Sequence, residues 1–122
     1  MKLHLASTDS QNTFTGYGDG YVLVNAQRYE HSLVVLPDQL VENWEVADVG
    51  GLREEQISFL AGLNVEIVLL GTGCELHFPH PRLLRPLALA GIGVEVMDTR
   101  AACRTYNVLL AEARNIAAAL IL

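Results

Sequence analysis

The chain has 122 residues, of which 51% are hydrophobic and only 18% are charged, and its mean hydropathy is +0.27. Fourteen acidic residues against 8 basic ones leave a formal net charge of −6. This composition excludes intrinsic disorder, and it argues against nucleic acid as a partner, because nucleic-acid binders carry a basic face.

The N-terminus predicts no targeting segment. It begins MKLHLASTDS, and its apolar stretch is shorter than the roughly 7–15 residues of a signal peptide. No apolar run approaches the ~20 residues that span a bilayer. Two cysteines, Cys74 and Cys103, stand far apart and form no disulfide framework. We therefore expect a single cytoplasmic domain over residues 1–122, with no membrane insertion and no nucleic-acid partner.

The first half of the chain predicts short extended segments. Residues 3–5 alternate apolar and polar and predict a strand, whereas residues 12–20 are rich in glycine and predict turns. Two apolar, β-branched runs at 21–24 and 28–36 flank a short polar turn and predict a β-hairpin. A further extended piece is expected at 41–46, around a tryptophan.

The second half alternates helices and strands. Helices are predicted at residues 53–61, 81–90 and 99–113, and strands at 65–70, 92–97 and 116–122. Gly62 is a plausible stop for the first helix, and Pro86 kinks the second or delays its start. The strands are almost continuously apolar, which is typical of strands covered on both faces. The pattern predicts an α/β fold with a mixed, partly parallel sheet, helices packed on it and a β-hairpin-rich N-terminal part.

A glycine turn follows the first of these strands. Gly71, Thr72 and Gly73 could let a backbone approach a ligand, as phosphate-binding loops do. A dinucleotide fingerprint needs a third glycine, and Leu76 stands there instead. The alternatives are a tight turn or a place in the lining of a pocket, since open α/β sheets bind ligands at the carboxyl ends of their strands.

The densest polar cluster lies at the start of the last helix. Asp98 or Thr99 is expected to cap this helix, and Arg100, Arg104 and Asn107 share one of its faces. These groups either tether the helix to the sheet or, together with the glycine turn, form a ligand or partner site. Two arginines at a helix start suit an anion or a carboxylate.

Cysteine and histidine offer weaker candidates. The spacing Cys74-x-x-His77-x-x-His80 contains zinc-ligand types but matches no familiar zinc frame, and an edge strand explains it equally. Cys103 lies in the first turns of a helix, where the dipole slightly favours a thiolate, although neighbouring alanines favour a buried, inert thiol. The sequence therefore predicts no metal site, no cofactor and no catalytic residue.

A group of acids surrounds the single tryptophan. Asp38, Glu42, Glu45 and Asp48 flank Trp44, and no paired general acid and base can be selected from them. The group is either a solvated face or a surface for a protein partner. In the second case an exposed Trp44 beside Glu45 is the anchor, because tryptophan is enriched at interface hot spots.

Several motifs together resemble one family. They are LVVLPDQLVENWEV, VEIVLLGTG, Phe78-Pro79, and above all GIGVEVMDTRAACRTYNVLLAEAR followed by AAALIL. The chain resembles the Mth-type family of small, uncharacterised bacterial and archaeal proteins. Its eukaryotic relatives are a mitochondrial assembly factor for NADH:ubiquinone oxidoreductase (complex I) and the adipogenesis-associated Mth domain-containing protein. One departure is Ala113, where the resemblance leads us to expect glycine, so either the glycine cap is dispensable or the helix runs one residue further.

The resemblance implies a single three-layer domain and no established catalytic residue or cofactor. It suggests a non-enzymatic accessory or assembly factor that acts by protein–protein contact, with subunits of respiratory NADH:quinone oxidoreductase as partners. The alternative is a small-molecule site for an anion, between Gly71–Gly73 and residues 98–107. Function does not follow from fold alone, so both hypotheses need a site.

Overall fold

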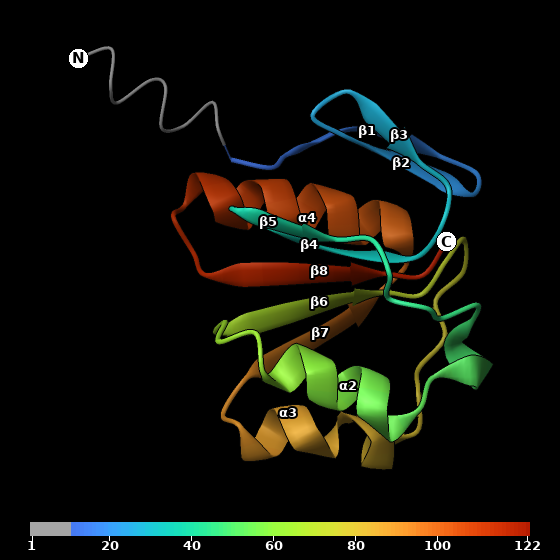
Figure 1. Cartoon of the computed structure of the whole chain (residues 1–122), viewed down its shortest axis with the longest axis vertical. Helices are drawn as coiled ribbons and strands as arrows, with labels where there is room; N and C mark the ends of the chain where they lie inside the picture. The colour runs from blue at the N-terminus through green and yellow to red at the C-terminus, as the bar shows by residue number, and fades with distance from the viewer. Residues whose placement is uncertain (1–10) are drawn as a thin grey trace.

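The computed structural model describes residues 11–122, which form two β-sheets with helices packed between and beside them (Figure 1). The strands are β1 (Phe14–Gly18), β2 (Tyr21–Val24), β3 (Gln27–Tyr29), β4 (Leu33–Leu36), β5 (Gln39–Val41), β6 (Ile67–Gly71), β7 (Gly93–Met97) and β8 (Ile116–Leu120). The helices are η1 (Val49–Gly51), α2 (Glu54–Ala61), η2 (Pro81–Leu84), α3 (Arg85–Leu89) and α4 (Thr99–Ala111). The strand predicted at residues 3–5 lies outside the described part.

The larger sheet has the order β5-β4-β8-β6-β7 and is mixed. Strand β6 runs parallel to both β7 and β8, whereas β4 pairs antiparallel with β8 and β5. Helices α2 and α3 cover one face of this sheet, and α4 covers the other (Figure 1). This architecture confirms the predicted α/β class, and none of the described helices is long and apolar enough to cross a membrane.

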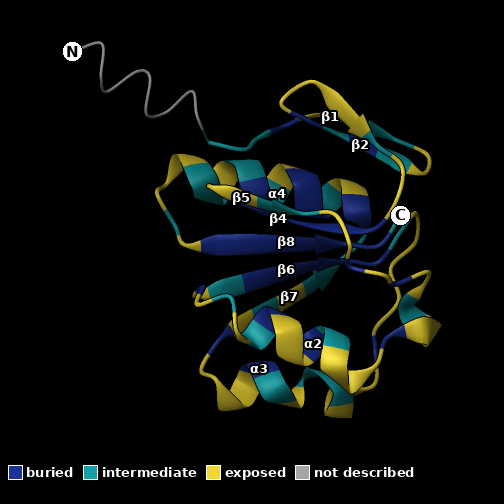
Figure 2. Ribbon diagram, in the orientation of Figure 1, coloured by how far each residue is buried: buried dark blue, intermediate teal, exposed yellow. Residues whose placement is uncertain are grey.

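Burial of the central strands on both faces explains their continuous apolar sequences. Every residue of β4 and β8 is buried (Figure 2). Alternate residues of each strand enter opposite cores: Val34 packs on the side of α2, whereas Leu33 and Val35 pack on the side of α4. A parallel or central strand buried in this way has no polar face.

The three-stranded sheet β1-β2-β3 lies over α4 as an outer layer (Figure 1). Its β2–β3 hairpin confirms the predicted turn, because Asn25 and Ala26 both take positive φ, as a two-residue hairpin turn requires. The turn-rich stretch predicted at residues 12–20 is a turn only at Asp19 and Gly20, because β1 occupies most of it. A Cβ at Gly16 would collide with the cross-strand Leu23 side chain, and a Cβ at Gly18 with that of Tyr21. These two positions of β1 therefore favour glycine.

Two other boundaries also differ from the predictions. Residues 28–36 were expected to form one strand, but the chain leaves the small sheet after β3 and enters the large sheet as β4. The extended piece expected at 41–46 is only partly a strand, because β5 ends at Val41 and the following residues have no regular structure. The local pattern of apolar residues does not indicate which of the two sheets a strand will join.

The helices of the second half agree with their predictions to within a few residues. Helix α2 ends at Gly62, as expected. The segment predicted as a helix at 81–90 is divided into η2 and α3, and Pro86 stands in the first turn of α3. Proline delays the start of that helix because it lacks the amide proton that an interior position must donate.

Helix α4 ends in a left-handed residue, although no glycine is present there. Ala113 has φ +59°, and its amide donates to the carbonyl of Leu110, while the amide of Arg114 donates to that of Leu109. This is the hydrogen-bond pattern of a Schellman cap, whose left-handed position favours glycine. The helix therefore does not run one residue further; alanine takes the capping conformation at a steric cost.

Replacing that alanine is expected to stabilise the protein. Ala113→Gly removes the unfavourable contact of Cβ at positive φ, and we expect the free energy of unfolding to rise by about 0.5–1 kcal/mol. Ala111→Gly, two residues earlier within α4, is the matched control and should lower it by about 0.5–1 kcal/mol. Urea denaturation followed by circular dichroism measures both, and a loss of stability in Ala113→Gly would contradict the account.

Candidate functional site

The glycine turn and the start of α4 meet at the carboxyl edge of the parallel strands, as the sequence predicted. Thr99 Oγ1 accepts a hydrogen bond from the amide of Gly73 (2.8 Å) and donates one to the carbonyl of Ile121 (2.9 Å). Thr72 Oγ1 donates to the carbonyl of Glu75 (2.7 Å) and accepts from the amide of His77 (3.2 Å). Both hydroxyls therefore form hydrogen bonds that connect neighbouring backbone segments.

The charged face of α4 is directed at the small sheet. Asp98 caps the helix, since its carboxylate accepts from the amide of Ala101 (2.9 Å). Arg100 pairs with Asp19 at 2.6 Å, and Arg104 donates to the hydroxyl of Tyr17 at 3.0 Å. That hydrogen bond raises the pKa of Arg104 above its ordinary value. The two arginines therefore contact the β1–β2 hairpin and its turn.

Asn107 completes this connection with both ends of its amide. Its Oδ1 accepts from the Phe14 amide (3.0 Å), and its Nδ2 donates to the Phe14 carbonyl (2.8 Å). Ninety-three residues separate these partners in sequence. Tyr106, one residue before, is buried, packs edge-on against the Phe14 ring at 5.0 Å and donates its hydroxyl to the carbonyl of Asn12.

Removing the Asn107 amide tests the connection between α4 and β1. Asn107→Ala leaves the amide and carbonyl of Phe14 without their partner, which we expect to cost about 1–3 kcal/mol of the free energy of unfolding. The Phe14 amide should also exchange its hydrogen faster. Val108→Ala, at an exposed position of the same helix, is the control and should change neither quantity appreciably. Unchanged exchange at Phe14 in Asn107→Ala would contradict the tethering role.

The space between the glycine turn and the start of α4 is small, although an open hollow of about 420 Å³ lies on the other side of the turn, beside Thr72, Glu75 and His77. The hollow lined by Gly73, Thr99 and Arg100 has a volume of about 30 Å³, which suits about two water molecules at most. An anion there would have to displace Asp19 from Arg100. The geometry favours the tethering alternative for residues 98–107, and the anion site stays a prediction.

The cysteine and histidine candidates do not come together in a metal site. In the part of the chain that the structure describes, no three His, Cys, Asp or Glu side chains lie close enough to hold a metal ion. Cys74 is exposed and Cys103 is buried. Burial raises the pKa of the Cys103 thiol to about 12, despite the counteracting charge of Arg104. The expected slight help from the helix dipole is therefore outweighed by desolvation, as the packing alternative predicts.

Trp44 lies differently from the prediction. Only 4% of its surface is exposed, so the expectation of an exposed tryptophan was wrong. Its indole belongs to the core between the large sheet and α2, and Nε1–H donates to the Gln56 carbonyl at 3.3 Å. Local sequence gave no sign of this burial, because it depends on α2 packing over residues 42–46.

A groove nevertheless opens beside Trp44, between the segment after β5 and helix α2. It has a volume of about 260 Å³ and is lined by Val41, Asn43, Trp44, Glu45, Glu55, Gln56 and Phe59. Its wall on α2 includes Phe59, which is 42% exposed. Sequence reasoning missed Phe59; its position outside the buried stripe of α2 (Ile57 and Leu60) was the available indication.

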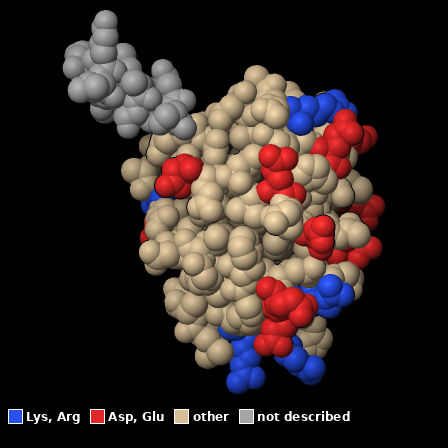
Figure 3. Space-filling view, in the orientation of Figure 1, with Lys and Arg blue, Asp and Glu red and all other residues tan. Residues whose placement is uncertain are grey.

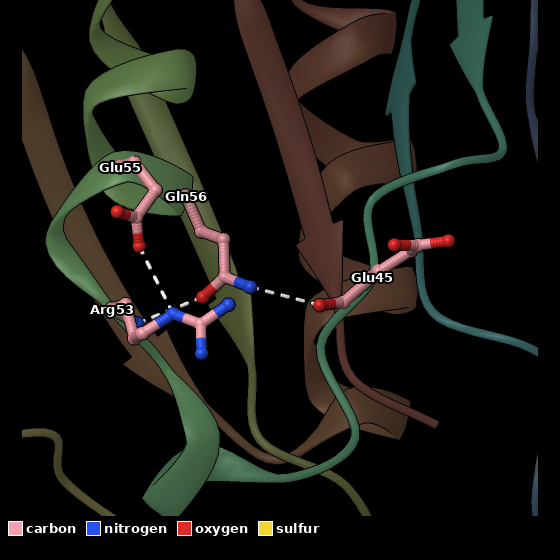
Figure 4. Close-up of polar contacts among 4 residues, drawn as sticks. All are labelled: Glu45, Arg53, Glu55 and Gln56. Carbon is pink, nitrogen blue, oxygen red and sulfur yellow. Dashed lines mark hydrogen bonds and ion pairs between the residues drawn. The ribbon is translucent and has the colours of Figure 1, made fainter.

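Gln56 fixes the two walls of this groove to one another (Figure 4). Its Oε1 accepts from the Arg53 amide at the start of α2 (2.8 Å), which is one of the two hydrogen bonds of a capping box, and its Nε2 donates to the Glu45 carbonyl (2.8 Å). This hydrogen bond engages only the backbone of Glu45, and Figure 4 shows its carboxylate directed away from α2. Glu55 pairs with Arg53 at 3.0 Å, but both side chains are about three-quarters exposed, so this ion pair is weak.

The rim of the groove is acidic. Glu45 and Glu55 line it, their near neighbours in sequence Glu42 and Glu54 are exposed, and Arg53 is the only lysine or arginine between residues 29 and 81. In Figure 3 acidic groups are scattered over the face, mainly toward its right side and below its centre, and basic groups lie at its upper right, its right and its lower end. The arrangement is an apolar floor inside a negatively charged border.

These features define a small α/β domain with a mixed sheet, helices on both of its faces, and a groove with an apolar floor beside exposed acids. The model of a protein family of unknown function (DUF498/DUF598) matches residues 14–121, and the chain belongs to this family.

Two of the curated relatives carry different functional descriptions. The NADH dehydrogenase [ubiquinone] 1 alpha subcomplex assembly factor 3 of Bos taurus is 37% identical over 107 residues, which are 86% of this chain and 58% of that protein. The "13 kDa major membrane protein" of Francisella tularensis is 30% identical over 109 residues, which are 88% of this chain and 89% of that protein. The chain thus spans little more than half of the bovine assembly factor.

Solved structures share the fold. A crystal structure of a Bordetella parapertussis protein superposes with a TM-score of 0.86 at 42% identity, covering 92% of this chain and 96% of that one. A solution structure from Bordetella pertussis, described as an Mth938-like domain, gives 0.79 at 36% identity, with coverage of 90% and 85%. These matches confirm the Mth-type resemblance and the α/β fold with a mixed sheet.

Proposed function

We propose that this protein is an accessory factor that binds subunits of respiratory NADH:quinone oxidoreductase during assembly and acts by protein contact. The similarity to the bovine assembly factor, 37% over 86% of the chain, carries this proposal. Two features of the molecule support it. The polar groups at residues 98–107 are engaged within the fold, and the groove beside Trp44 is the open apolar hollow that a partner side chain could enter.

The proposal places the protein in the cytoplasm, on the surface of a membrane-embedded enzyme. A factor that binds such an enzyme would fractionate partly with membranes without a spanning helix of its own. The name of the Francisella tularensis relative, a major membrane protein, is compatible with this behaviour.

Affinity purification at native expression level tests the role. The protein carries a tag at its own chromosomal locus, and mass spectrometry identifies what co-purifies, with a tagged unrelated small acidic protein as the control. We expect reproducible enrichment of NADH:quinone oxidoreductase subunits. In a deletion strain, native gels should show less of the fully assembled enzyme. The assembly role would be contradicted if the tagged protein recovered no more respiratory subunits than the control does and if the deletion strain contained an unchanged amount of assembled enzyme.

A further inference from the structure

The groove beside Trp44 has the size of a side-chain pocket. Its volume of about 260 Å³ lies below the roughly 300–1,000 Å³ of sites that enclose small-molecule ligands. A space of this size accepts a large apolar side chain, which would lie against the buried Trp44 and the half-exposed Phe59. Anchoring of an apolar side chain in a preformed pocket is the usual centre of a protein–protein interface.

The border of the groove determines the charge of its occupant. Glu45 has no ion-pair partner among the described residues, and Glu42 has only a half-exposed histidine, His31, at 3.6 Å. An acidic segment would be repelled by the exposed acids beside the groove, whereas lysine or arginine would be attracted to them. The indole and Gln56 hold both walls in place before binding, so little ordering is needed on association.

We propose that this groove docks a partner segment with an apolar anchor side chain flanked by lysine or arginine. The inference deepens the proposed function and rests on it for the source of the segment, a subunit of the respiratory enzyme. The chemistry of the occupant rests on the groove alone. Trp44 and Glu45 then belong to the partner surface in different ways: Trp44 forms its floor from within the core, and Glu45 supplies charge on its rim.

A phage-displayed library of random short peptides tests the chemistry without reference to any partner. Selected peptides should combine an apolar residue with neighbouring lysine or arginine. Because the chain has a single tryptophan, which lines the groove, binding should change its fluorescence. We expect Glu45→Lys to weaken binding of the best peptide about fivefold, mainly through the association rate, and Phe59→Ala about tenfold.

Matched controls lie on the other side of the sheet. Glu112→Lys reverses an exposed acid at the end of α4, and Val108→Ala shortens an exposed apolar side chain on the same helix. Neither should change peptide affinity. The inference is overturned if the selected peptides are acidic, if none binds above background, or if the groove variants bind them as well as the controls do.

The same variants separate this inference from the proposed function. If Glu45→Lys and Phe59→Ala still co-purify with the respiratory subunits, the assembly role stands and the groove is not its docking site. If basic, apolar peptides bind as expected but no respiratory subunit co-purifies, the groove stands and the assembly role falls. A photoreactive side chain at position 59 that cross-links to a second copy of this chain would overturn the inference in favour of self-association.

Discussion

Trp44→Ala is expected to lower the free energy of unfolding by about 3–5 kcal/mol, the usual cost of deleting a buried tryptophan. The indole is 4% exposed and packs in the core beneath α2 with Leu36, Val46 and Leu60. The substitution leaves a cavity there, and it leaves the Gln56 carbonyl without its donor. Urea denaturation followed by circular dichroism measures the loss, since the variant has no tryptophan fluorescence.

Phe59→Ala is the matched control for this large effect. Phe59 lines the same groove, but 42% of its surface is exposed in the folded protein, so its side chain buries much less apolar surface than Trp44 does. Its removal should cost less than about 1 kcal/mol, as surface substitutions usually do. Equal losses in the two variants would show that the indole contributes no more to the core than an exposed ring does. For the same reason Trp44→Ala is a poor probe of partner binding, whereas Phe59→Ala and Glu45→Lys are good ones.

The alternating helices and strands of the second half could be predicted because each element carries its own pattern. The continuous apolar runs of β6, β7 and β8 indicated burial on both faces, and the structure confirms this for β6 and β8. The edge strand β7 is only partly buried, since no strand covers its outer side among the described residues. Pro86 marked a true interruption of helix, because proline acts locally on the backbone.

The first half could not be predicted as well, because its strands are assigned by distant contacts. Whether residues 28–36 form one strand or two depends on β8, which pairs with β4 and lies some 80 residues further along the chain. The expected turns at 12–20 became β1 for a similar reason. Phe14 is held by Asn107 and Tyr106 of α4, and nothing within residues 12–20 indicates these partners.

In the candidate site, too, the features set by local sequence could be predicted and those set by distant contacts could not. Sequence reasoning found the polar residues of α4 and correctly placed them near the glycine turn. It left open whether they bind a ligand or tether the helix, because that choice depends on Asp19, Tyr17 and Phe14, far away in sequence. It selected Glu45 and Trp44 as a surface, of which Glu45 is exposed and Trp44 is buried. The groove exists only because α2 folds over the segment after β5.

Gly71→Ala is expected to destabilise the protein by about 1–3 kcal/mol, the typical cost of overpacking a filled core. A Cβ at this position would lie 2.8 Å from Leu120 Cδ2, 3.0 Å from Thr99 Oγ1 and 3.1 Å from Thr99 Cα. The last of these atoms is backbone at the start of α4, and it cannot move without disturbing the hydrogen bonds of Thr99 to Gly73 and Ile121. The glycine is therefore needed for the close approach of helix and strand.

A second glycine separates this steric effect from the general effect of replacing glycine. At Gly50 an added Cβ would meet only the Asp48 carboxylate, at 3.4 Å, and Gly50→Ala should change stability little. If Gly71→Ala proves as stable as Gly50→Ala in urea denaturation, α4 can move away from β6 at low cost, and the glycine turn would not be set by packing. The turn would then again be a candidate for ligand binding, and the anion-site alternative would gain support. A large loss confined to Gly71→Ala assigns Gly71 to helix–sheet packing and leaves the groove beside Trp44 as the better candidate site.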